Sequence, residues 1–440
     1  MNHQEKVQRI VEQLKNHAPT KGPLSLQKDA VSHVVPNPHD PKHRDQKVNL
    51  RGLNEILRID LQEKICEAEP GVTFFDLVQK TIPLNLVPLL VPELKTITIG
   101  GAVSGCSVES MSYKYGGFHD SCLEYEIITG TGEVLTCSSD QNADLFHMIH
   151  GSYGTLGIIS KLKFKLIAAK PFVKIEYLRY RTFDQFATTL RQQIQLGQAD
   201  FLDGIIHAPD NYTLCLGEFV NQAPYTSDYT WLHIYYKSTR EKSHDYLTTT
   251  NYLFRYDTEC HWLSRSIPGM ETKLLRLLLG KQILSSTNLL GWSKRLAPLL
   301  RFDKRPDVVV DVFIPWNRFE KFYRRYQAEI NYYPLWIVPY RRVQKYPWIN
   351  EEYDKRIGDP LFIDLAVYGL KNRRRDLNYY QILEEMVYDC NGIKTLISHN
   401  SYSKERFWEI YNRPNYEKIK QRTDPQNRFR ELYEKFHFEQ

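Results

Sequence analysis

The sequence lacks the features that would assign it at once to a simple class. No run of about 18 uninterrupted apolar residues occurs in its 440 residues, so no segment is expected to span a bilayer. The seven cysteines include no C-x-x-C pair, and their odd number predicts neither a disulfide framework nor a zinc site. The opening residues, MNHQEKVQRIVEQLKNH, are charged and amphipathic, unlike a signal peptide. We therefore expect a cytoplasmic protein without a metal.

The sequence also has little excess charge. A net charge of +6 fits attraction to an anionic ligand or a membrane surface. It is far from the concentrated basic stripe of a nucleic-acid-binding protein, so no nucleic-acid partner is expected. What the sequence has in quantity is aromatic residues, 13% of the chain with 29 tyrosines, which favours a large and partly polar interior pocket.

The order of apolar patterns predicts an α+β protein. Residues 3–17 have helical spacing, residues 32–45 are typical of a loop, and residues 71–82 predict a second helix. Residues 124–137 predict a β-hairpin around Thr131-Gly132, and the dense run of short strands stops near residues 168–171. Longer mixed segments follow. The length favours two domains, the first over residues 1–170 and the second over residues 171–400.

Two glycine clusters are the most informative local pattern. The first lies in VPELKTITIGGAVSGCSVESMSYKYGG (residues 91–117), and the second is GSYGTLG (residues 151–157). Glycine lets the backbone approach a ligand closely, and exposed N–H groups can then bind phosphate or carbonyl oxygens. Neither cluster matches G-x-G-x-x-G or a P-loop. From the residues alone, an extended cofactor gripped from two sides and a pair of structural turns stay equal alternatives.

The order of motifs resembles a known superfamily. ICEAEPGVTFFDLV, the first glycine cluster, CLEYEIITGTGEVLTC and DLFHMIHGSYGTLGIISKLKFKLIAAK are similar to the FAD-binding domain of the vanillyl-alcohol oxidase (PCMH-type) superfamily. Within it the sequence most resembles the Δ24-sterol reductases of the diminuto/seladin type. The resemblance implies a two-domain fold: an FAD-binding domain, an α+β substrate or cap domain, and a C-terminal return over residues 401–440, where RTDPQNRFRELY lies.

The resemblance also implies which residues bind the cofactor. Residues 98–110 are expected to line the isoalloxazine and pyrophosphate, and the second glycine cluster to meet the flavin through backbone groups. The expected cofactor-binding residues are Thr98, Gly100, Gly101, Gly105, Ser107, Ser110, Gly154, Thr155, Gly157 and Ile158, with Ser32 and His33 in the upstream loop. That loop, QKDAVSH, departs from the family because it lacks the usual glycines. Non-covalent FAD is expected, and His33, Cys106 and His119 are the residues that would form a covalent bond instead.

The proton donor is expected in the second half of the chain, because a carbon that accepts hydride also needs an acid nearby. The polar candidates are His261, Arg265, Tyr340, Arg341, Tyr368, His399, Asn400 and Tyr402. Of these, His261, Arg265, His399 and Tyr402 are preferred, because HWLSRS and SHNSYS match places where the family closes over the flavin. For each one alone, a surface or core role is the more frequent alternative.

A basic, leucine-rich segment spans residues 270–301, METKLLRLLLGKQILSSTNLLGWSKRLAPLLR. Its mixture of apolar and basic residues is typical of a helix that lies on an anionic membrane surface. A buried helical hairpin or a dimer interface is an equal alternative. With no spanning segment, the sequence predicts a soluble or peripheral membrane protein.

Together these observations predict an FAD-dependent oxidoreductase, similar to Δ24-sterol reductases. It would reduce a C=C bond of a sterol, isoprenoid or other lipid-like substrate by hydride transfer from the reduced flavin. NADPH would be a transient reductant, since no dinucleotide site is recognisable. An alcohol or sugar oxidase or dehydrogenase on the same fold is the alternative enzyme. A flavin-free lipid-binding or membrane-associated protein is the alternative of another class.

Overall fold

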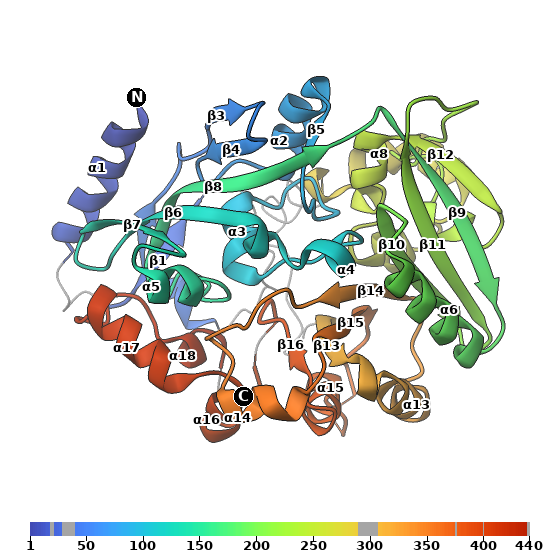
Figure 1. The fold of residues 1–440 in the computed structure, drawn as a ribbon. Coiled ribbons are helices and arrows are strands. Elements are labelled where there is room, and N and C mark those ends of the chain that lie inside the picture. The colour runs from blue at the N-terminus through green and yellow to red at the C-terminus, as the bar shows by residue number, and fades with distance from the viewer. Residues whose placement is uncertain (18–21, 29–39, 289–306, 375, 399, 438–440) are drawn as a thin grey trace.

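Two antiparallel sheets organise the chain, one in each half (Figure 1). The computed structural model describes residues 1–17, 22–28, 40–288, 307–374, 376–398 and 400–437. Helices and antiparallel strands are mixed along the whole chain, which confirms the predicted α+β class.

The first sheet belongs to the N-terminal half and has the strand order β3-β4-β8-β6-β7, with β5 paired to the far end of β8. Its strands are β3 (Ile56–Asp60), β4 (Ile65–Ala68), β5 (Leu86–Pro88), β6 (Cys122–Ile128), β7 (Val134–Ser138) and β8 (Ile158–Ala168). The hairpin predicted over residues 124–137 is confirmed as β6 and β7. Gly132 lies in its turn with a φ of +85°, a backbone conformation that glycine adopts without a steric penalty.

Short helices surround this sheet. They are α2 (Phe74–Thr81), η3 (Ile82–Leu84), α3 (Ile99–Gly105), α4 (Ser112–Tyr115), η4 (Phe118–Ser121) and α5 (Ala143–Met148). Helix α2 begins where Thr73 caps it by accepting a hydrogen bond from Asp76 N, and it buries Phe74, Leu77 and Val78 against the sheet.

A smaller layer closes the other side of the N-terminal half. Strand β1 (Leu24–Gln27) pairs in parallel with β2 (Gln46–Asn49), and the helices η2 (Pro41–Arg44) and α1 (His3–Lys15) accompany them. Helix α1 buries the apolar face that the sequence predicted. The predicted loop of residues 32–45 holds the short helix η2, and its residues 32–39 lie outside the described part of the chain.

The second sheet has eight strands in the order β12-β9-β11-β10-β14-β15-β13-β16. They are β9 (Phe172–Tyr180), β10 (Phe201–Ala208), β11 (Asn211–Val220), β12 (His244–Thr248), β13 (Val308–Pro315), β14 (Leu335–Arg341), β15 (Leu361–Leu370) and β16 (Ile393–Lys394). Strand β8 of the first sheet leads into β9 through Ala169–Pro171. The domain boundary expected there stays a prediction.

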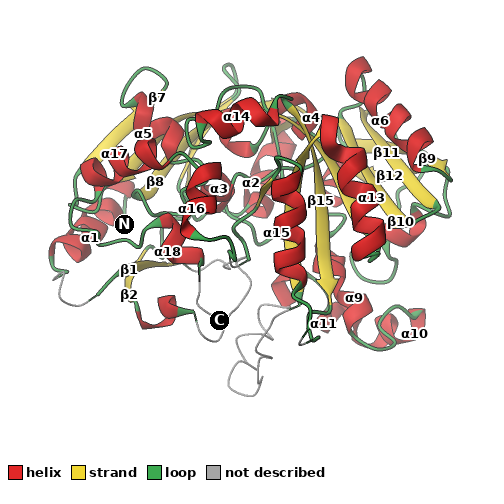
Figure 2. Cartoon of the chain, turned by 90° about the horizontal axis from the view of Figure 1, so that it is seen from below, coloured by secondary structure: helices red, strands yellow, loops and turns green. Residues whose placement is uncertain are grey.

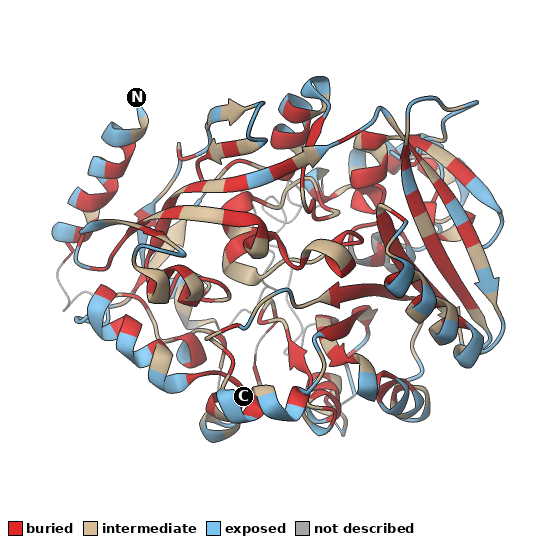
Figure 3. Ribbon diagram, in the orientation of Figure 1, coloured by how far each residue is buried: buried red, intermediate tan, exposed pale blue. Residues whose placement is uncertain are grey.

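The two faces of this sheet carry different side chains, because strand residues alternate between faces. The outer face is aliphatic and packs against α6 (Phe183–Leu196), α13 (Phe319–Glu329) and α15 (Tyr379–Asp389), as Figure 2 shows. Figure 3 shows the matching pattern in α6, with buried and exposed residues alternating along the helix. The inner face is turned towards the N-terminal half and holds aromatic and acidic residues.

The remaining helices lie around these layers. Between β11 and β13 are α7 (Tyr235–Ser238), α8 (Thr249–Leu253), η5 (Asp257–Trp262), α9 (Leu263–Ser266), α10 (Lys273–Leu275), the π-helix η6 (Arg276–Gly280) and α11 (Lys281–Ile283). After β13 come η7 (Trp316–Arg318), α14 (Glu351–Ile357), α16 (Lys404–Ile410), α17 (Arg413–Thr423) and α18 (Leu432–Phe436). No helix in the described residues has both the length and the apolar character needed to cross a membrane.

The C-terminal segment is tied to the N-terminal half by a buried lysine. Lys420 Nζ donates to Thr155 O at 2.9 Å, to Phe429 O at 2.7 Å and to Asp424 Oδ2 at 2.7 Å. The Leu24 N–H donates to Arg428 O at 2.7 Å, so the chain after α17 lies beside β1. The segment therefore reaches the second glycine cluster and the β1 edge together.

Candidate functional site

A cavity of about 790 Å³ lies between the two halves of the chain. The glycine-rich α3 and the second glycine cluster line it from one side, and the inner face of the eight-stranded sheet lines it from the other. Strands β1 and β2 and the end of α18 form a third wall. A cavity of this size and shape can hold an extended cofactor together with part of a substrate.

The first glycine cluster forms a wall without side chains. Thr98 caps α3, and its Oγ1 accepts a hydrogen bond from Gly101 N at 3.3 Å. A Cβ on Gly100 would lie 2.4 Å from Pro70 Cβ, so only glycine fits this contact. Gly154 in the second cluster has a φ of +76° and packs against Leu26 of β1. Both clusters therefore expose backbone to the same cavity.

Most of the predicted cofactor-binding residues line this cavity. They are Thr98, Gly100, Gly101, Gly105, Ser107, Gly154, Gly157 and Ile158. Ser110 and Thr155 do not line it: Ser110 hydrogen-bonds to Glu109, and Thr155 Oγ1 donates to Ser152 O at 2.8 Å. Ser32 and His33 lie outside the described residues. The functional roles of all these residues stay predictions.

One end of the cavity is basic. The side chains that supply this charge are Lys28, Lys42, Lys47, Arg51 and Lys435. Lys435 Nζ donates to Tyr153 O at 2.6 Å, and the Lys28 ammonium lies 3.8 Å from the position of a Cβ on Gly101. Burial, together with the positive charges of Lys42 and Lys28, lowers the pKa of Lys435 to about 7. Asp40, which also lines this end, pairs with Lys42 at 3.0 Å.

This end fits the diphosphate of FAD. Burial and the neighbouring lysines both disfavour the charged form of Lys435, and an anion placed among these cations would stabilise it. The adjoining glycine wall lets backbone N–H groups approach the same ligand. Lys28, Lys435 and the residues of the first glycine cluster are therefore the groups that would hold the cofactor.

The opposite end of the cavity is acidic and lies on the inner sheet face. Asp311 of β13 is paired across the sheet with Ala366 of β15, and Asp364 and Tyr368 lie on either side of that alanine. Tyr368 donates to Asp311 Oδ1 at 2.5 Å. Asp364 is 3% exposed, and its Oδ1 accepts no hydrogen bond from any part of the chain that the structure describes. Glu93, from the loop before α3, lines the cavity with them.

The environment of this acidic end favours protonated carboxyl groups. Burial, reinforced by the negative charges of Glu109 and Asp311, raises the pKa of Glu93 to about 8. Burial raises the pKa of Asp311 to about 6, although the Tyr368 hydrogen bond opposes the shift. Burial and the charges of Asp311 and Glu93 raise the pKa of Asp364 well above its ordinary value. At neutral pH, the carboxyl group of Glu93 is therefore mostly protonated and that of Asp311 is mostly ionised.

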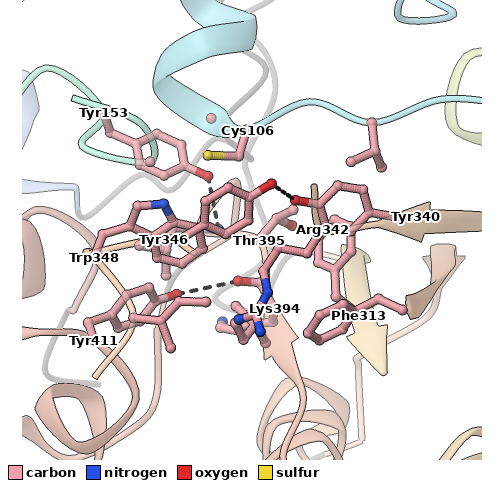
Figure 4. Close-up of a pocket in the computed structure, with 17 residues that line it drawn as sticks. Cys106, Tyr153, Phe313, Tyr340, Arg342, Tyr346, Trp348, Lys394, Thr395 and Tyr411 are labelled. Carbon is pink, nitrogen blue, oxygen red and sulfur yellow. Dashed lines mark hydrogen bonds between the residues drawn. The ribbon is translucent and has the colours of Figure 1, made fainter. Parts of the chain in front are cut away.

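An aromatic pocket adjoins the cavity, and the two share Gly105, Cys106, Val108, Tyr153, Phe313 and Thr395. Figure 4 shows the rings of Tyr340, Tyr346, Trp348 and Tyr411 around it. Tyr346 donates to Asp120 Oδ2 at 2.7 Å and also hydrogen-bonds to Tyr340. Burial and the charge of Asp120 raise the pKa of Tyr340 well above its ordinary range. The pocket therefore offers an apolar surface with neutral phenols at its edge.

The residues named for covalent attachment differ in their surroundings. Cys106 lines both the cavity and the aromatic pocket, and burial raises the pKa of its thiol well above the ordinary value. His119 is 1% exposed, and burial lowers the pKa of its imidazole. His33 lies outside the described residues. A neutral thiol is a weak nucleophile, which supports non-covalent binding.

Two of the four preferred proton donors, Arg265 and Tyr402, lie away from the cavity. Arg265 is exposed and donates to Tyr333 O at 2.5 Å, and Tyr402 is buried and donates to Glu384 O at 2.7 Å. Neither lines the cavity or the aromatic pocket. His261 lies in η5, and His399 is outside the described residues. Tyr340 and Tyr368, named among the candidates but not preferred, do line these spaces.

Sequence reasoning missed Glu93, Asp311 and Asp364. The signal was present: each aspartate is the one charged residue in an otherwise apolar strand, in VVVDVFI and LFIDLAVY. A charge at such a position is rarely solvated and usually has a partner or a function.

Comparison with known proteins first defines the class. Residues 4–138 match the family model described as an FAD binding domain. The glycine-rich wall of the cavity, from Thr98 to Ser107, lies within this match. The match confirms the predicted resemblance to an FAD-binding domain of the PCMH type, and the fold is mixed α+β, as the sequence predicted.

The similarity then extends along most of the chain to one group of enzymes. Delta(24)-sterol reductase of Homo sapiens is 25% identical over 407 residues, which cover 89% of this chain and 77% of that protein. Delta(24)-sterol reductase of Pisum sativum is 26% identical over 403 residues, 83% of this chain and 71% of that protein. Cytokinin dehydrogenase 3 of Arabidopsis thaliana is 30% identical over 189 residues, 40% of this chain and 36% of that protein. The resemblance to Δ24-sterol reductases within an FAD-binding oxidoreductase family is confirmed.

Proposed function

We propose that the protein reduces a C=C bond of a sterol, isoprenoid or other lipid-like substrate, with non-covalent FAD as cofactor and NADPH as reductant. Two kinds of observation support this proposal. Several relatives that match most of the chain are named Delta(24)-sterol reductase. The cavity joins a basic, glycine-lined end to an acidic end beside an aromatic pocket.

The observation that carries the proposal is the acidic end. Reducing an unactivated C=C bond adds a hydride to one carbon and a proton to the other. Reduced FAD supplies hydride chemistry, and the protein must supply the proton. Glu93 holds a proton at neutral pH because burial and like charges raise its pKa, and the same causes raise the pKa of Asp364. Glu93 is therefore a neutral acid on the wall of the cavity.

Each acidic residue has a distinct role in this proposal. Glu93 is half-buried and accessible from the cavity, so its carboxyl group donates the proton to the substrate carbon. Asp364 is more deeply buried, and its carboxyl group is a second acid on the cavity wall. Asp311 is held by Tyr368, and its charge keeps the pKa of Asp364 high. Trp336 and Phe313, which share this sheet face, keep water away from the reacting carbons.

The aromatic pocket supports an apolar substrate. Phe313, Tyr340 and Phe362 lie on the same inner sheet face as the two aspartates and lead from the acidic end to this pocket. A hydrocarbon end group enclosed by these rings loses contact with water, which favours binding of a branched alkene over a sugar. Because such a substrate resides in membranes, peripheral association with a bilayer is part of the proposal.

A dehydrogenase acting in the opposite direction is the second candidate. The similarity to cytokinin dehydrogenase 3 and the carboxyl group of Asp311, with a pKa of about 6, favour it. An ionised carboxylate can accept a proton from a substrate that is being oxidised.

The two candidates separate in one anaerobic experiment. The purified protein is reconstituted with FAD and precipitated with acid, and the colour is expected in the supernatant because the flavin is not bonded to the chain. In a second portion, kept without acid, NADPH is expected to bleach the bound flavin. A Δ24-unsaturated sterol is then expected to restore the flavin colour. If an alcohol bleaches the flavin and no alkene restores it, the dehydrogenase is favoured. A protein that takes up no FAD contradicts both.

Replacing Lys435 with methionine is expected to weaken FAD binding about tenfold to a hundredfold, since a charged hydrogen bond to the diphosphate is lost. Because the pKa of Lys435 is about 7 in the free protein, FAD binding must also take up a proton above that pH. The affinity of the unchanged protein should therefore fall as pH rises above 7, and that of the variant should not. Quenching of flavin fluorescence on titration measures the FAD affinity of each protein at each pH.

Lys418→Met is the matched control, because that lysine is 70% exposed in α17, on the same C-terminal segment. It should bind FAD like the unchanged protein. Equal affinity in the Lys435 and Lys418 variants would show that the diphosphate lies elsewhere.

A further inference from the structure

Four leucines between β12 and β13 point away from the protein. Leu274, Leu277, Leu278 and Leu279, here called the leucine face, are 68%, 58%, 63% and 40% exposed. They lie on the short consecutive helices α10 and η6, which Figure 2 shows near the edge of the molecule through the labelled α10. Single exposed leucines are ordinary, but a contiguous group of this kind marks an interaction surface.

The exposure of these leucines is fixed by a buried arginine. Arg276, in the middle of the group, is 1% exposed. Its Nη1 pairs with Glu259 Oε1 at 2.7 Å, and its Nε donates to Trp231 O at 2.8 Å. The segment thus buries its arginine and exposes its leucines, the reverse of an ordinary surface helix. The four leucines are thus exposed in the part of the chain that the structure describes.

The charges beside the leucine face are positive. Lys273 and Lys281 flank it, and both are exposed. The sequence has no acidic residue between Glu271 and Asp303, and Glu271 is paired with Lys237 at 3.0 Å. Apolar side chains bordered by lysines complement a bilayer with anionic headgroups, since the leucines enter the acyl region and the lysines stay at the phosphates. A second copy of the chain would offer no such charge complement, because its own leucine face carries the same lysines.

We infer that the leucine face docks the protein on an anionic lipid bilayer. This inference rests on the proposed function, because it names the source of the lipid-like substrate.

The chain just after the leucine face is hydrogen-bonded to a segment beside the cavity wall. Ser286, which follows α11, donates to Asp257 Oδ1 at 2.5 Å. The same oxygen accepts a hydrogen bond from Lys95 N at 2.9 Å. Lys95 follows Glu93 and Leu94, which both line the cavity. The docked segment and the wall that carries Glu93 are therefore held together.

The inference is tested with the FAD-loaded, full-length protein and sedimented vesicles. Vesicles of phosphatidylcholine with phosphatidylglycerol are compared with vesicles of phosphatidylcholine alone. The unchanged protein should bind the anionic vesicles more tightly. The triple variant Leu274→Ser, Leu277→Ser and Leu278→Ser should lose at least about tenfold in that affinity, because three apolar side chains no longer enter the bilayer.

The matched control carries Leu61→Ser, Leu84→Ser and Leu196→Ser, three exposed leucines outside the leucine face. It should bind vesicles like the unchanged protein. Equal binding by both triple variants would overturn the inference. So would a dimer of the unchanged protein that becomes a monomer in the leucine-face variant, because a second copy would then cover this surface.

Activity separates this inference from the proposed function. The leucine-face variant should reduce a detergent-dispersed sterol as fast as the unchanged protein, and be slow only with substrate in vesicles. Vesicle binding through the leucine face without reduction of any lipid would uphold the docking and contradict the proposed function. Full activity on vesicle substrate by the variant would contradict the docking.

Discussion

Glu93→Gln is expected to slow reduction of the substrate by about a hundredfold to ten-thousandfold, the range for loss of a general acid. Glutamine has the size and charge of the protonated glutamic acid that burial favours here, so the fold should be unaffected. Rapid mixing of the reduced protein with substrate measures the step. Reduction of the flavin by NADPH should be unchanged, because that half of the reaction needs no proton from Glu93.

The pH profile gives a second readout for Glu93. Because its pKa is raised to about 8, the carboxyl group is protonated below that pH and ionised above it. Substrate reduction by the unchanged protein should therefore decline as pH rises through about 8. The Glu93→Gln variant should lack this decline.

Glu63→Gln is the control, since Glu63 is an exposed glutamate in the turn between β3 and β4. It should keep the rate and the pH profile of the unchanged protein. A Glu93→Gln variant with the full rate would move the proton donor to Asp364, and Asp364→Asn would then be the next variant to measure.

Arg255→Met is expected to lower the free energy of unfolding by about 3–5 kcal/mol, the cost of breaking a buried ion pair. Arg255 is 2% exposed and joins three parts of the chain. Its Nη2 lies 3.0 Å from Glu109 Oε1 of the N-terminal half and 3.1 Å from Asp203 Oδ2 of β10. Asp203 also accepts a hydrogen bond from Trp336 Nε1 at 2.8 Å, and Trp336 lines the cavity. Without the guanidinium, two carboxyl groups stay buried without a counter-charge.

Urea unfolding followed by circular dichroism and tryptophan fluorescence measures this loss. Arg324→Met is the control, because Arg324 is 62% exposed and its pair with Glu320 is open to solvent. The control should unfold at the same urea concentration as the unchanged protein. If Arg255→Met does so too, the network does not stabilise the contact between the two halves. Adding Glu109→Gln to Arg255→Met should restore part of the loss.

Local patterns predicted the elements better than their arrangement. The spacing of Val7, Ile10, Val11 and Leu14 predicted α1, and all four are buried. The pairing of β10 with β14 could not be predicted from the sequence, because it joins residues more than a hundred positions apart and has no local pattern. The leucine-rich segment was predicted either as a helix on a membrane surface or as a buried hairpin or dimer interface. Its residues 273–283 are helical without a break, with the π-helix η6 between α10 and α11, and residues 289–301 lie outside the described chain.

The residues of the candidate site also differ in how far the sequence predicted them. Gly100 and Gly154 were found because glycine clusters have a clear sequence signature and a family resemblance. The acidic end combines a loop residue, Glu93, with Asp311 and Asp364 from two strands that become neighbours only in the folded sheet. The SHNSYS and HWLSRS segments were preferred because they match places where the family closes over the flavin, and the roles of their residues stay predictions. An isolated acid inside an apolar strand was the stronger signal.

The acidic end also sets how the fold responds to alkali. An unfolded chain releases the Glu93 proton near the ordinary pKa of 4.5, whereas the folded chain keeps it until about 8. Between these values the folded state binds more protons, so its stability declines as pH rises, and Asp364 acts in the same direction. The raised pKa that keeps Glu93 protonated therefore lowers the free energy of unfolding at alkaline pH. The Glu93→Gln variant should lose less stability than the unchanged protein as pH rises.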